Sequence, residues 1–319
     1  MLVLKEHDIT GLVSMAEAID TLEGAFQAQD AGLAANRPRD RVRAPGGSAV
    51  LHMLGAALEH EGIIGFKAYT TARGGARFLL MLFSSDTGAP IAMIEADRLG
   101  QLRTGAATGL ATRLMSRLDA YSVGIYGSGY QAETQLEAVC AVRSITSAGV
   151  YSPHKEKRDA FAARMSERLN VDITSVNRPE DAAQADILVT ATTSREPVLR
   201  GEWLSTGTHI NAIGANNLNR REIDDEVVRR SSAVAVDSRE QALREAADLI
   251  SPMERGWLTW ERVRELREIV SGARPGRGSR EDITLFKSLG IGLEDVALGG
   301  LVYRKALAAG LGSQLSFLD

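Results

Sequence analysis

The chain has 319 residues, of which 44% are hydrophobic and 24% are charged, and its formal net charge at pH 7 is -4. This length predicts about two domains, and the hydrophobic content is ample for a sizeable core in each. A pI near 5.9 gives no electrostatic footprint for nucleic acid or an anionic membrane, so we expect a small-molecule partner. The five histidines form no zinc motif and there are no cysteine pairs, so we predict no metal.

The N-terminal residues, the apolar runs and the single cysteine bear on the cellular location of the protein. The first ten residues carry acid and histidine where a secretory signal has a cationic flank and a long apolar core. The longest apolar run, residues 78–83, is far shorter than the roughly 20 residues that span a bilayer as a helix. Cys140 cannot form an intrachain disulfide. Together these features predict a soluble protein of the reducing cytoplasm.

The first third of the chain passes from a helical pattern to a strand pattern. Ser14 and Glu17 form a capping box ahead of hydrophobic residues at helical spacing, which predicts an amphipathic helix that ends near Gly32. Short β-rich runs then follow, separated by glycine, serine and Asp-Thr-Gly turns, at residues 49–54, 63–70, 78–83 and 90–95. This spacing predicts a meandering, mostly antiparallel sheet.

The remainder of the chain alternates between strand and helix patterns. Residues 103–118 are rich in alanine, glycine, leucine and methionine at helical spacing, which predicts a helix that joins two domains. Apolar runs with helical patterns between several of them follow at residues 122–126, 148–151, 187–190, 209–213 and 233–236. Alternating βα units predict an α/β fold with a doubly wound, parallel sheet of the Rossmann type.

The stretch YSVGIYGSGYQAET at residues 121–134 carries the sharpest motif. A short apolar run stops at Gly127 and Gly129 and passes into a helical pattern that includes Ala132. These residues fit G-x-G-x-x-[GA], the strand-turn-helix fingerprint of a dinucleotide fold. The first glycine permits a tight turn, the second lets the backbone approach a pyrophosphate, and the alanine lets the helix pack closely on the sheet. The free N–H groups at the helix start then face an anion.

The end of the second strand of this domain bears on the choice of cofactor. An acidic residue there usually binds the ribose 2′-hydroxyl and disfavours a 2′-phosphate. Here the strand at residues 148–151 is followed by Ser152, Pro153, His154 and Lys155. A hydroxyl followed by basic groups favours NADP(H), with NAD(H) as the alternative. The same basic residues could instead belong to a solvated helix face.

Three cations lie where the predicted fold gives no reason for them. Lys67 interrupts an otherwise apolar or small-residue strand, although a lysine on an exposed edge strand would give the same pattern. Arg103 begins the alanine-rich helix, where its charge opposes the macrodipole, although its stem could simply pack on Leu99 or Leu102. An arginine beside unpaired helix N–H groups suits a carboxylate or phosphate. Arg41 belongs to a cluster of four arginines from which pattern alone cannot select one.

The chain resembles the ornithine cyclodeaminase and mu-crystallin family over nearly its full length. The resemblance is specific because a series of stretches occurs in order. These stretches are Phe66-Lys67, Gly88-Ala-Pro90, RTGAATGLATRLM from Arg103, GSGYQA from Gly127, TATTSREPVL from Thr190, THINAIGANNLNRREID from Thr208, VDSREQALREAADL from Val236 and TLFKSLGIGLEDVA from Thr284.

The resemblance implies a homodimer of two-domain subunits. Residues 1–118 with 292–319 would form an α+β domain for substrate binding and dimerisation, and residues 119–291 would form the Rossmann domain that binds the nicotinamide cofactor. The positions that align with cofactor contacts are Arg103, Thr104, Gly127, Gly129, Tyr130, Gln131, Ser152, Thr190, Thr192, Ile213, Gly214, Ala215 and Arg220.

The resemblance also implies a substrate site. Residues matching Arg41, Lys67 and Arg103 grip the substrate carboxylate beside the nicotinamide, and Leu289 aligns with a residue that lines the substrate. A fixed carboxylate supplies orientation for hydride transfer at the adjacent carbon. One departure concerns Asn216, because the cyclodeaminases carry an aspartate there for the substrate amine and the proton transfers. Asparagine can hydrogen-bond an amine or imine but cannot act as a general base, so the base stays unassigned.

This departure leads us to expect an imine reductase that uses NAD(P)H and acts on Δ1-pyrroline-2-carboxylate or Δ1-piperideine-2-carboxylate. A protonated imine needs a clamp and a hydride more than a strong protein base, and Asn216 is compatible with that. The alternatives are an alanine-type amino-acid dehydrogenase and ornithine cyclodeaminase proper, a lyase with catalytic NAD+. A non-catalytic binding protein like mu-crystallin is the alternative from another class.

Overall fold

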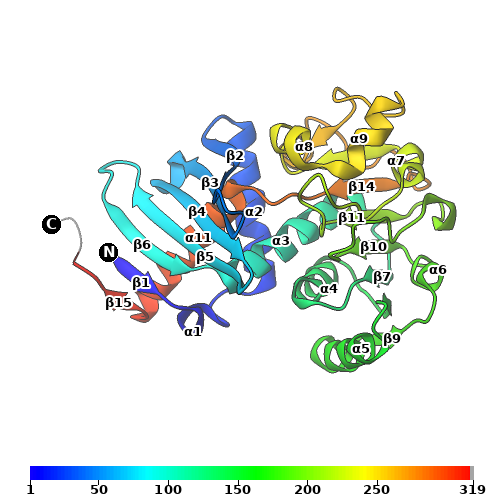
Figure 1. Ribbon diagram of the computed structural model, residues 1–319, viewed down its shortest axis with the longest axis horizontal. Coiled ribbons are helices and arrows are strands. Elements are labelled where there is room, and N and C mark those ends of the chain that lie inside the picture. Colours follow the sequence, from blue (N-terminus) through cyan, green and yellow to red (C-terminus); the bar gives the residue numbers. More distant parts are fainter. Residues whose placement is uncertain (317–319) are drawn as a thin grey trace. The chain divides into compact units, whose positions relative to one another are not determined.

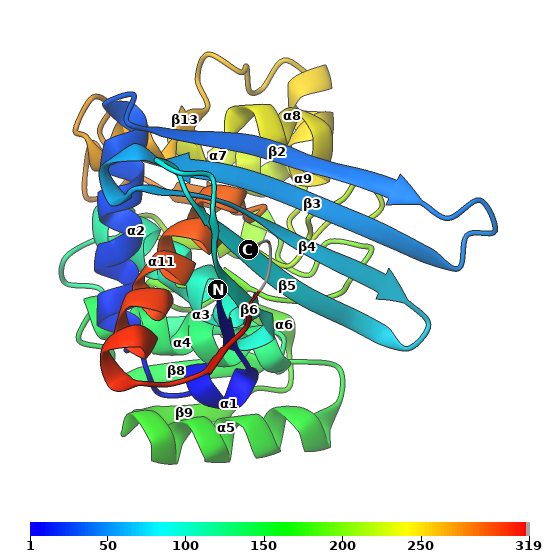
Figure 2. The same ribbon diagram turned by 90° about the vertical axis from the view of Figure 1, so that its left-hand side faces the viewer.

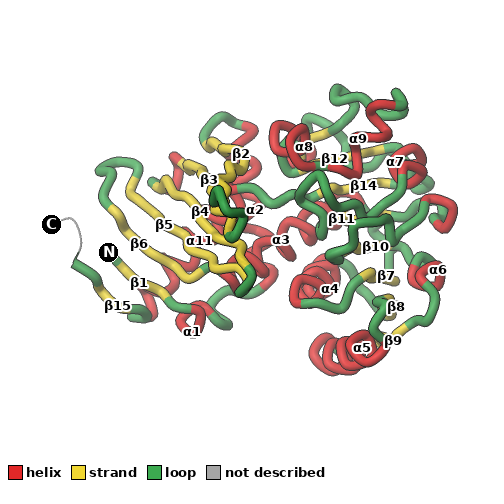
Figure 3. The backbone as a smooth tube through the Cα atoms, viewed as in Figure 1, coloured by secondary structure: helices red, strands yellow, loops and turns green. Residues whose placement is uncertain are grey.

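The computed structural model describes residues 1–316, which form two compact units. The first unit comprises Met1–Thr104 and the chain from Ile291 onward, and the second comprises Gly105–Gly290. The boundary at 104/105 lies inside the helix α3 (Asp97–Met115), whereas the sequence pattern places it after that helix, at residue 118. Figure 1 shows the elements of each unit, and Figure 3 marks the same chain by helix, strand and loop.

The first unit contains a seven-stranded sheet in the order β15-β1-β6-β5-β4-β3-β2. Consecutive strands from β2 to β6 pair antiparallel, while β1 pairs parallel with β6, so the predicted antiparallel meander is confirmed. The strands are β1 (Leu2–Leu4), β2 (Ala34–Arg43), β3 (Ala49–Leu58), β4 (Ile63–Ala72), β5 (Gly75–Ser84), β6 (Pro90–Glu95) and β15 (Ser313–Gln314).

Helices cover one face of this sheet. The helix α2 (Met15–Asp30) begins at the predicted capping box, in which Ser14 Oγ accepts a hydrogen bond from Glu17 N and Glu17 Oε2 accepts one from Ser14 N. The helix α11 (Gly292–Ala309) packs on β3 and β4 and against α2 (Figure 2). The short α1 (Glu6–Ile9) and η1 (Glu59–Glu61) complete the unit.

Glycines allow α11 to lie close to the sheet. A Cβ added at Gly65 of β4 would be 2.6 Å from the carbonyl oxygen of Met81 and 3.3 Å from a methyl group of Val296 in α11. A Cβ added at Gly292 would be 2.9 Å from the carbonyl oxygen of Gly55. Contacts this short exclude any larger residue, so the first turns of α11 are fixed against β3 and β4.

The second unit contains an eight-stranded sheet in the order β13-β12-β14-β11-β10-β7-β8-β9, and every pairing is parallel. The predicted α/β fold with a doubly wound sheet is therefore confirmed. Its strands are β7 (Ser122–Tyr126), β8 (Ser147–Tyr151), β9 (Asp172–Ser175), β10 (Ile187–Thr190), β11 (His209–Ala212), β12 (Ala233–Val236), β13 (Arg264–Glu265) and β14 (Thr284–Lys287). Its helices are α4 (Tyr130–Val142), α5 (Lys155–Leu169), α6 (Pro179–Ala182), η2 (Gly201–Trp203), α7 (Asp225–Arg230), α8 (Arg239–Glu245), α9 (Ala247–Glu254) and α10 (Leu266–Val270).

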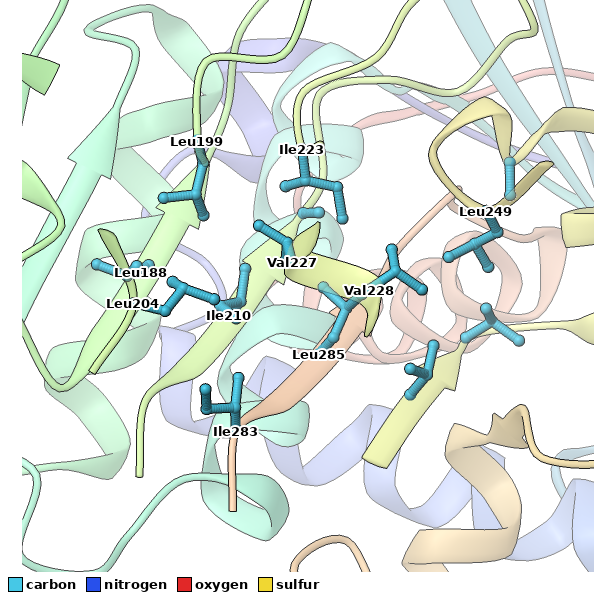
Figure 4. Packing of buried hydrophobic residues seen from close by; sticks show 14 of the residues in the cluster. Leu188, Leu199, Leu204, Ile210, Ile223, Val227, Val228, Leu249, Ile283 and Leu285 are labelled. Carbon is cyan, nitrogen blue, oxygen red and sulfur yellow. The ribbon is translucent and has the colours of Figure 1, made fainter. Parts of the chain in front are cut away.

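Both faces of this sheet are buried, which explains the almost uninterrupted apolar runs of its strands. One face packs on α4 and α5 through Val123, Leu136, Val150 and Phe161. The opposite face packs on α7 and α9, and Figure 4 shows side chains of that cluster, among them Leu188, Ile210, Val227, Val228, Leu249 and Leu285. Among residues 1–316, no helix has the length and apolar character needed to cross a membrane.

Candidate functional site

The turn after β7 has the backbone shape that the glycine motif predicts. Gly127 has φ +107, and a Cβ there would lie 2.4 Å from the carbonyl oxygen of Ala191, so only glycine fits. Gly129 is the N-cap of α4, and a Cβ there would meet nothing within 4 Å, so the space before the helix is open. Ala132 is fully buried. A ligand can therefore approach the backbone N–H groups at the start of α4.

A pocket of ≈ 450 Å³ lies at this turn. It is at the carboxyl ends of β7, β8 and β10, where β8 lies on one side of β7 and β10 on the other, which is the topological switch point where such folds bind dinucleotides. No acidic side chain is among the described residues that line it: Tyr126, Gly127, Ser128, Gly129, Tyr151, Ser152, Pro153, His154, Lys157, Ala191, Thr192, Thr193, Ser194 and Val198. The residues present thus fit an anionic dinucleotide.

The residues that follow β8 differ in whether they line the pocket, pair with an acid or fix the loop. Ser152 and His154 line the pocket, and so does Lys157. The ammonium of Lys155 lies 2.5 Å from a carboxylate oxygen of Asp159 and does not line it. The buried Arg158 donates to the carbonyl oxygen of Ser152 at 2.8 Å, which fixes the loop that carries the serine hydroxyl. The cation at the pocket is therefore Lys157, two residues beyond the lysine that the sequence pattern selects.

One buried carboxylate ties together two loops that follow the sheet. Glu222 Oε1 accepts hydrogen bonds from Thr192 N at 2.7 Å and Thr192 Oγ1 at 2.8 Å. Its Oε2 accepts from Gly214 N at 2.6 Å and Ala215 N at 3.1 Å. A Cβ on Gly214 would lie 2.4 Å from the carbonyl oxygen of Thr192, so the loops touch directly. Glu222 therefore sets the spacing between the ends of β10 and β11.

A second layer of buried charge supports Glu222. Asp248 Oδ1 accepts a hydrogen bond from Glu222 N at 2.8 Å, and Asp248 Oδ2 lies 2.9 Å from the Lys287 ammonium. Lys287 also donates to the carbonyl oxygen of Ala215 at 2.6 Å. Burial raises the pKa of Glu222, and the charge of Lys287 opposes that rise. The network fixes the backbone that leads to Asn216.

The other expected cofactor residues of the second unit lie in or beside these segments, and Thr104 belongs to the first unit. Tyr130 and Gln131 form the first turn of α4, and Thr190 is the fully buried last residue of β10. Ile213, Asn216 and Arg220 belong to the loop after β11, where Ile213 is buried and the other two are half-buried. Thr104 is buried in α3, where its hydroxyl donates to the carbonyl oxygen of Gly100.

Leu289, expected near the substrate, is buried in the hydrophobic cluster of the second unit. Its N–H donates to Asp237 Oδ2 at 2.6 Å, and Gly290 N donates to the same oxygen. Burial raises the pKa of Asp237, and these backbone donors oppose the rise. Asp237 thus fixes the backbone around Leu289.

Lys67 and Arg103 come together in the first unit around two buried acids. The Lys67 ammonium donates to Asp295 Oδ1 at 2.7 Å, and Arg103 Nε donates to the same oxygen at 3.0 Å. Arg103 Nη1 donates to Glu294 Oε2 at 2.8 Å. Lys67 is 3% exposed and Arg103 9%, while both acids are fully buried, so neither cation is a solvated surface group. Sequence reasoning missed these two acids, because acidic residues are favourable in the first turn of a helix.

The cluster of arginines on β2 is sorted by burial. Arg39 is buried, and its charge is among those that lower the pKa of Lys67. Arg41 is half-buried and its Nε donates to Nδ1 of His52 at 3.2 Å. Burial, followed by the charge of Arg41, lowers the pKa of His52 to about 4, so this ring is neutral and can accept that bond. Arg39 joins the two cations, whereas Arg41 is partnered by His52.

Burial, followed by the charge of Arg103, lowers the pKa of Lys67 to about 8, and Asp295 opposes this. Lys67 therefore carries its charge below about pH 8. Arg39, Lys67 and Arg103 are buried, as are Glu294 and Asp295, and buried cations of this kind are suited to an anionic ligand. No group of three side chains able to hold a metal ion occurs in the part of the chain that the structure describes.

The comparisons with known proteins agree on one family. The chain matches the model of the ornithine cyclodeaminase/mu-crystallin family over residues 1–310. It is 31% identical to a Δ1-pyrroline-2-carboxylate reductase of Bacillus cereus, over 99% of this chain and all of that protein.

Two solved structures match nearly the whole fold. The Δ1-pyrroline-2-carboxylate reductase of Thermococcus litoralis, in complex with NADH and L-proline, is 37% identical with a TM-score of 0.94, over 99% of this chain and 100% of that one. An archaeal alanine dehydrogenase dimer with bound NAD is 32% identical with a TM-score of 0.93, over 100% of this chain and 99% of that one. The chain belongs to the ornithine cyclodeaminase/mu-crystallin family.

Proposed function

We propose that this chain is a nicotinamide-dependent reductase of cyclic ketimines that carry a carboxylate, with Δ1-pyrroline-2-carboxylate and Δ1-piperideine-2-carboxylate as substrates. The observation that carries the proposal is the buried cluster of Lys67 and Arg103, which offers a carboxylate two charge-assisted donors of fixed geometry. The reductases of Bacillus cereus and Thermococcus litoralis, which cover nearly the whole chain, support it.

The residues of the chain divide the work as follows. The bound cofactor supplies the hydride for the C=N carbon. Arg103 and Lys67 bind the carboxylate, which orients the adjacent carbon and supplies proximity. Lys67 does so as an ammonium at neutral pH, since its pKa is lowered only to about 8. Asn216 can hydrogen-bond an imine nitrogen but cannot remove a proton, which favours reduction over the ornithine cyclisation that requires a base.

An amino-acid dehydrogenase of the alanine type is the second candidate. The archaeal alanine dehydrogenase, at 32% identity over the whole chain, supports it. Such an enzyme reduces an open-chain imine, so the same carboxylate clamp serves. The two functions differ in that the open-chain imine must first be formed from a keto acid and ammonia with loss of water, whereas the cyclic ketimine needs only hydride and a proton.

Turnover with preformed ketimines tests the function. We expect the purified chain to consume reduced cofactor on addition of Δ1-pyrroline-2-carboxylate, with proline as the product and with much slower turnover of pyruvate plus ammonia. The measurement is the absorbance of the reduced nicotinamide, with both cofactors. Release of ammonia from ornithine without net change in cofactor would instead identify a cyclodeaminase. Cofactor binding with no turnover of any of these substrates would identify a binding protein.

We also propose a preference for NADP(H). Ser152 directly follows β8, where an acidic residue would select NAD(H), and the pocket is lined by Lys157 and by no acidic group among the described residues. Replacing Lys157 by alanine should lower the affinity for NADPH by roughly tenfold and change the affinity for NADH by less than about twofold. This difference is expected for the loss of one contact to the 2′-phosphate. Dissociation constants from fluorescence titration measure this.

Lys155→Ala is the matched control, because that lysine pairs with Asp159 and does not line the pocket. We expect it to leave both dissociation constants unchanged. If wild-type protein bound NADH more tightly than NADPH, the preference would be the reverse of the one proposed.

We propose that the chain forms a homodimer. On the face of the first sheet opposite Lys67, the strand register places Met53, Ile64 and Phe66 together, and all three are exposed. Exposed large apolar side chains on one sheet face are typical of a protein interface. The archaeal alanine dehydrogenase is itself a dimer, which supports the same assembly.

A further inference from the structure

We propose that Asp295 is a positioning residue, which through one carboxylate oxygen fixes both Lys67 and Arg103 in the orientation that binds the substrate carboxylate. The inference rests on the proposed function for the identity of that substrate. Asp295 itself need not touch the substrate, because its bonds to both cations already define where their remaining donors point.

The geometry of the bridge is the first argument. Asp295 Oδ1 accepts from Lys67 Nζ at 2.7 Å and from Arg103 Nε at 3.0 Å. An ammonium has three N–H donors, and the bond to Asp295 uses one of those of Lys67, while Arg103 also donates to Glu294. A single oxygen that joins the two groups fixes their separation, which neither cation could maintain alone against their mutual repulsion.

The rigidity of α11 is the second argument. A Cβ at Gly65 of β4 would lie 3.3 Å from a methyl group of Val296 in α11, and a Cβ at Gly292 of α11 would lie 2.9 Å from the carbonyl oxygen of Gly55 in β3, so the first turns of α11 lie directly against both strands. The N–H of Leu293 donates to Asn36 Oδ1 of β2 at 3.0 Å, which ties the helix start to a further strand. The positive end of the helix macrodipole stabilises the negative charge of Asp295 in this first turn. Asp295 is therefore a fixed point to which the cations are attached.

The charges around Lys67 are the third argument. The groups that act on its ammonium are Arg103 from α3, Arg39 from β2 and Asp295 from α11. Burial and the two arginines lower the pKa of Lys67, and Asp295 opposes them. Changing Asp295 to asparagine keeps the shape and removes the negative charge, so Lys67 should lose its proton at a lower pH.

Titration of Lys67 tests the charge effect without any substrate. Lysines labelled with ¹³C at Cε are followed by NMR against pH in the wild-type chain and in Asp295→Asn, with Lys67→Met to assign the signal. We expect a midpoint near pH 8 in the wild type and a midpoint lower by at least about 1 pH unit in the variant. Glu61→Gln is the control, because Glu61 of η1 forms an ion pair with Arg304 of α11 and none with Lys67 or Arg103, and it should leave the midpoint of Lys67 unchanged.

Binding of pyrrole-2-carboxylate, a flat monocarboxylate probe, tests the orientation effect by calorimetry. Where the titration shows that Lys67 of Asp295→Asn is still charged at pH 6, a loss of affinity at that pH is not caused by loss of the lysine proton. We expect Asp295→Asn to bind the probe at least about tenfold more weakly at pH 6, with a larger loss at pH 8.5. Asp295→Glu keeps the negative charge but moves the carboxylate oxygen. The Lys67 midpoint should therefore stay near that of the wild type, while the probe should still bind weakly.

An unchanged midpoint in folded Asp295→Asn, or wild-type affinity for the probe at pH 6 in either variant, would overturn the proposal. Neither measurement needs turnover. If the wild-type chain reduced no ketimine, the proposed function would fail while the titration and the binding of the probe still decided the role of Asp295.

Discussion

Replacing Lys67 by methionine should lower kcat/KM for the ketimine by roughly 10³-fold, because the change removes a buried charge that binds the substrate carboxylate. Methionine fills a similar volume, and Asp295 retains its bond from Arg103 at 3.0 Å, so the cluster is not left with an unpaired carboxylate. The fold should therefore survive. Steady-state kinetics measure the loss, and titration of the cofactor should give the wild-type dissociation constant.

The control for this variant is Lys305→Met. Lys305 also lies in the first unit and also pairs with a carboxylate, Glu17, at 2.6 Å, but it is partly exposed and lies ten residues after Asp295 on α11. We expect it to retain wild-type kinetics. Near-normal turnover by Lys67→Met would show that the buried cluster is not the carboxylate site.

The sequence reveals Lys67 because a charge in an apolar strand breaks a local rule. The sequence pattern selects Arg103 as a cation at a helix start, and this reason is wrong, because α3 begins at Asp97 and Arg103 lies in its second turn. Their partners Glu294 and Asp295 break no such rule, since acids in the first turn of a helix are favourable. Lys67 and Asp295 are 228 positions apart, and only the return of α11 to the first sheet brings them together.

Arg39, the third buried cation, could not be selected from the sequence because the register of β2 is irregular. In a regular strand, alternate residues share a face, so the arginines of β2 would be equivalent in pattern. The pairing of β2 with β3 shifts between Arg37 and Asp40, and Arg39 lies in that irregular part. A bulge redirects side chains in a way that no spacing rule predicts. Burial of Arg39 and the bond from Arg41 to His52 follow from that local geometry.

The dinucleotide fold of the second unit could be predicted from sequence because its signals are local. Its glycine motif and its alternating strands and helices are local patterns, and the parallel sheet follows from them. The network of Glu222, Asp248 and Lys287 is not local, because β14, which ends at Lys287, is inserted between β11 and β12. From sequence, Glu222 is therefore only an acidic residue six positions after Asn216.

Glu222 nevertheless carries the second large effect that we expect. Changing Glu222 to glutamine places an amide N–H₂ against donors that now bond to its two oxygens, from Thr192, Gly214 and Ala215. Each buried donor left without an acceptor costs about 1–3 kcal/mol. The loops after β10 and β11 should then move apart, and we expect the cofactor to bind at least about tenfold more weakly.

The test must separate this local effect from a general loss of stability. Asp237→Asn is the matched control, because Asp237 is equally buried and accepts N–H bonds from Leu289 and Gly290, away from Thr192 and Gly214. Both variants should unfold at lower temperature, while only Glu222→Gln should lose cofactor affinity by fluorescence titration. Equal losses of affinity in the two variants would mean that Glu222 supports the unit as a whole rather than the spacing of the cofactor loops.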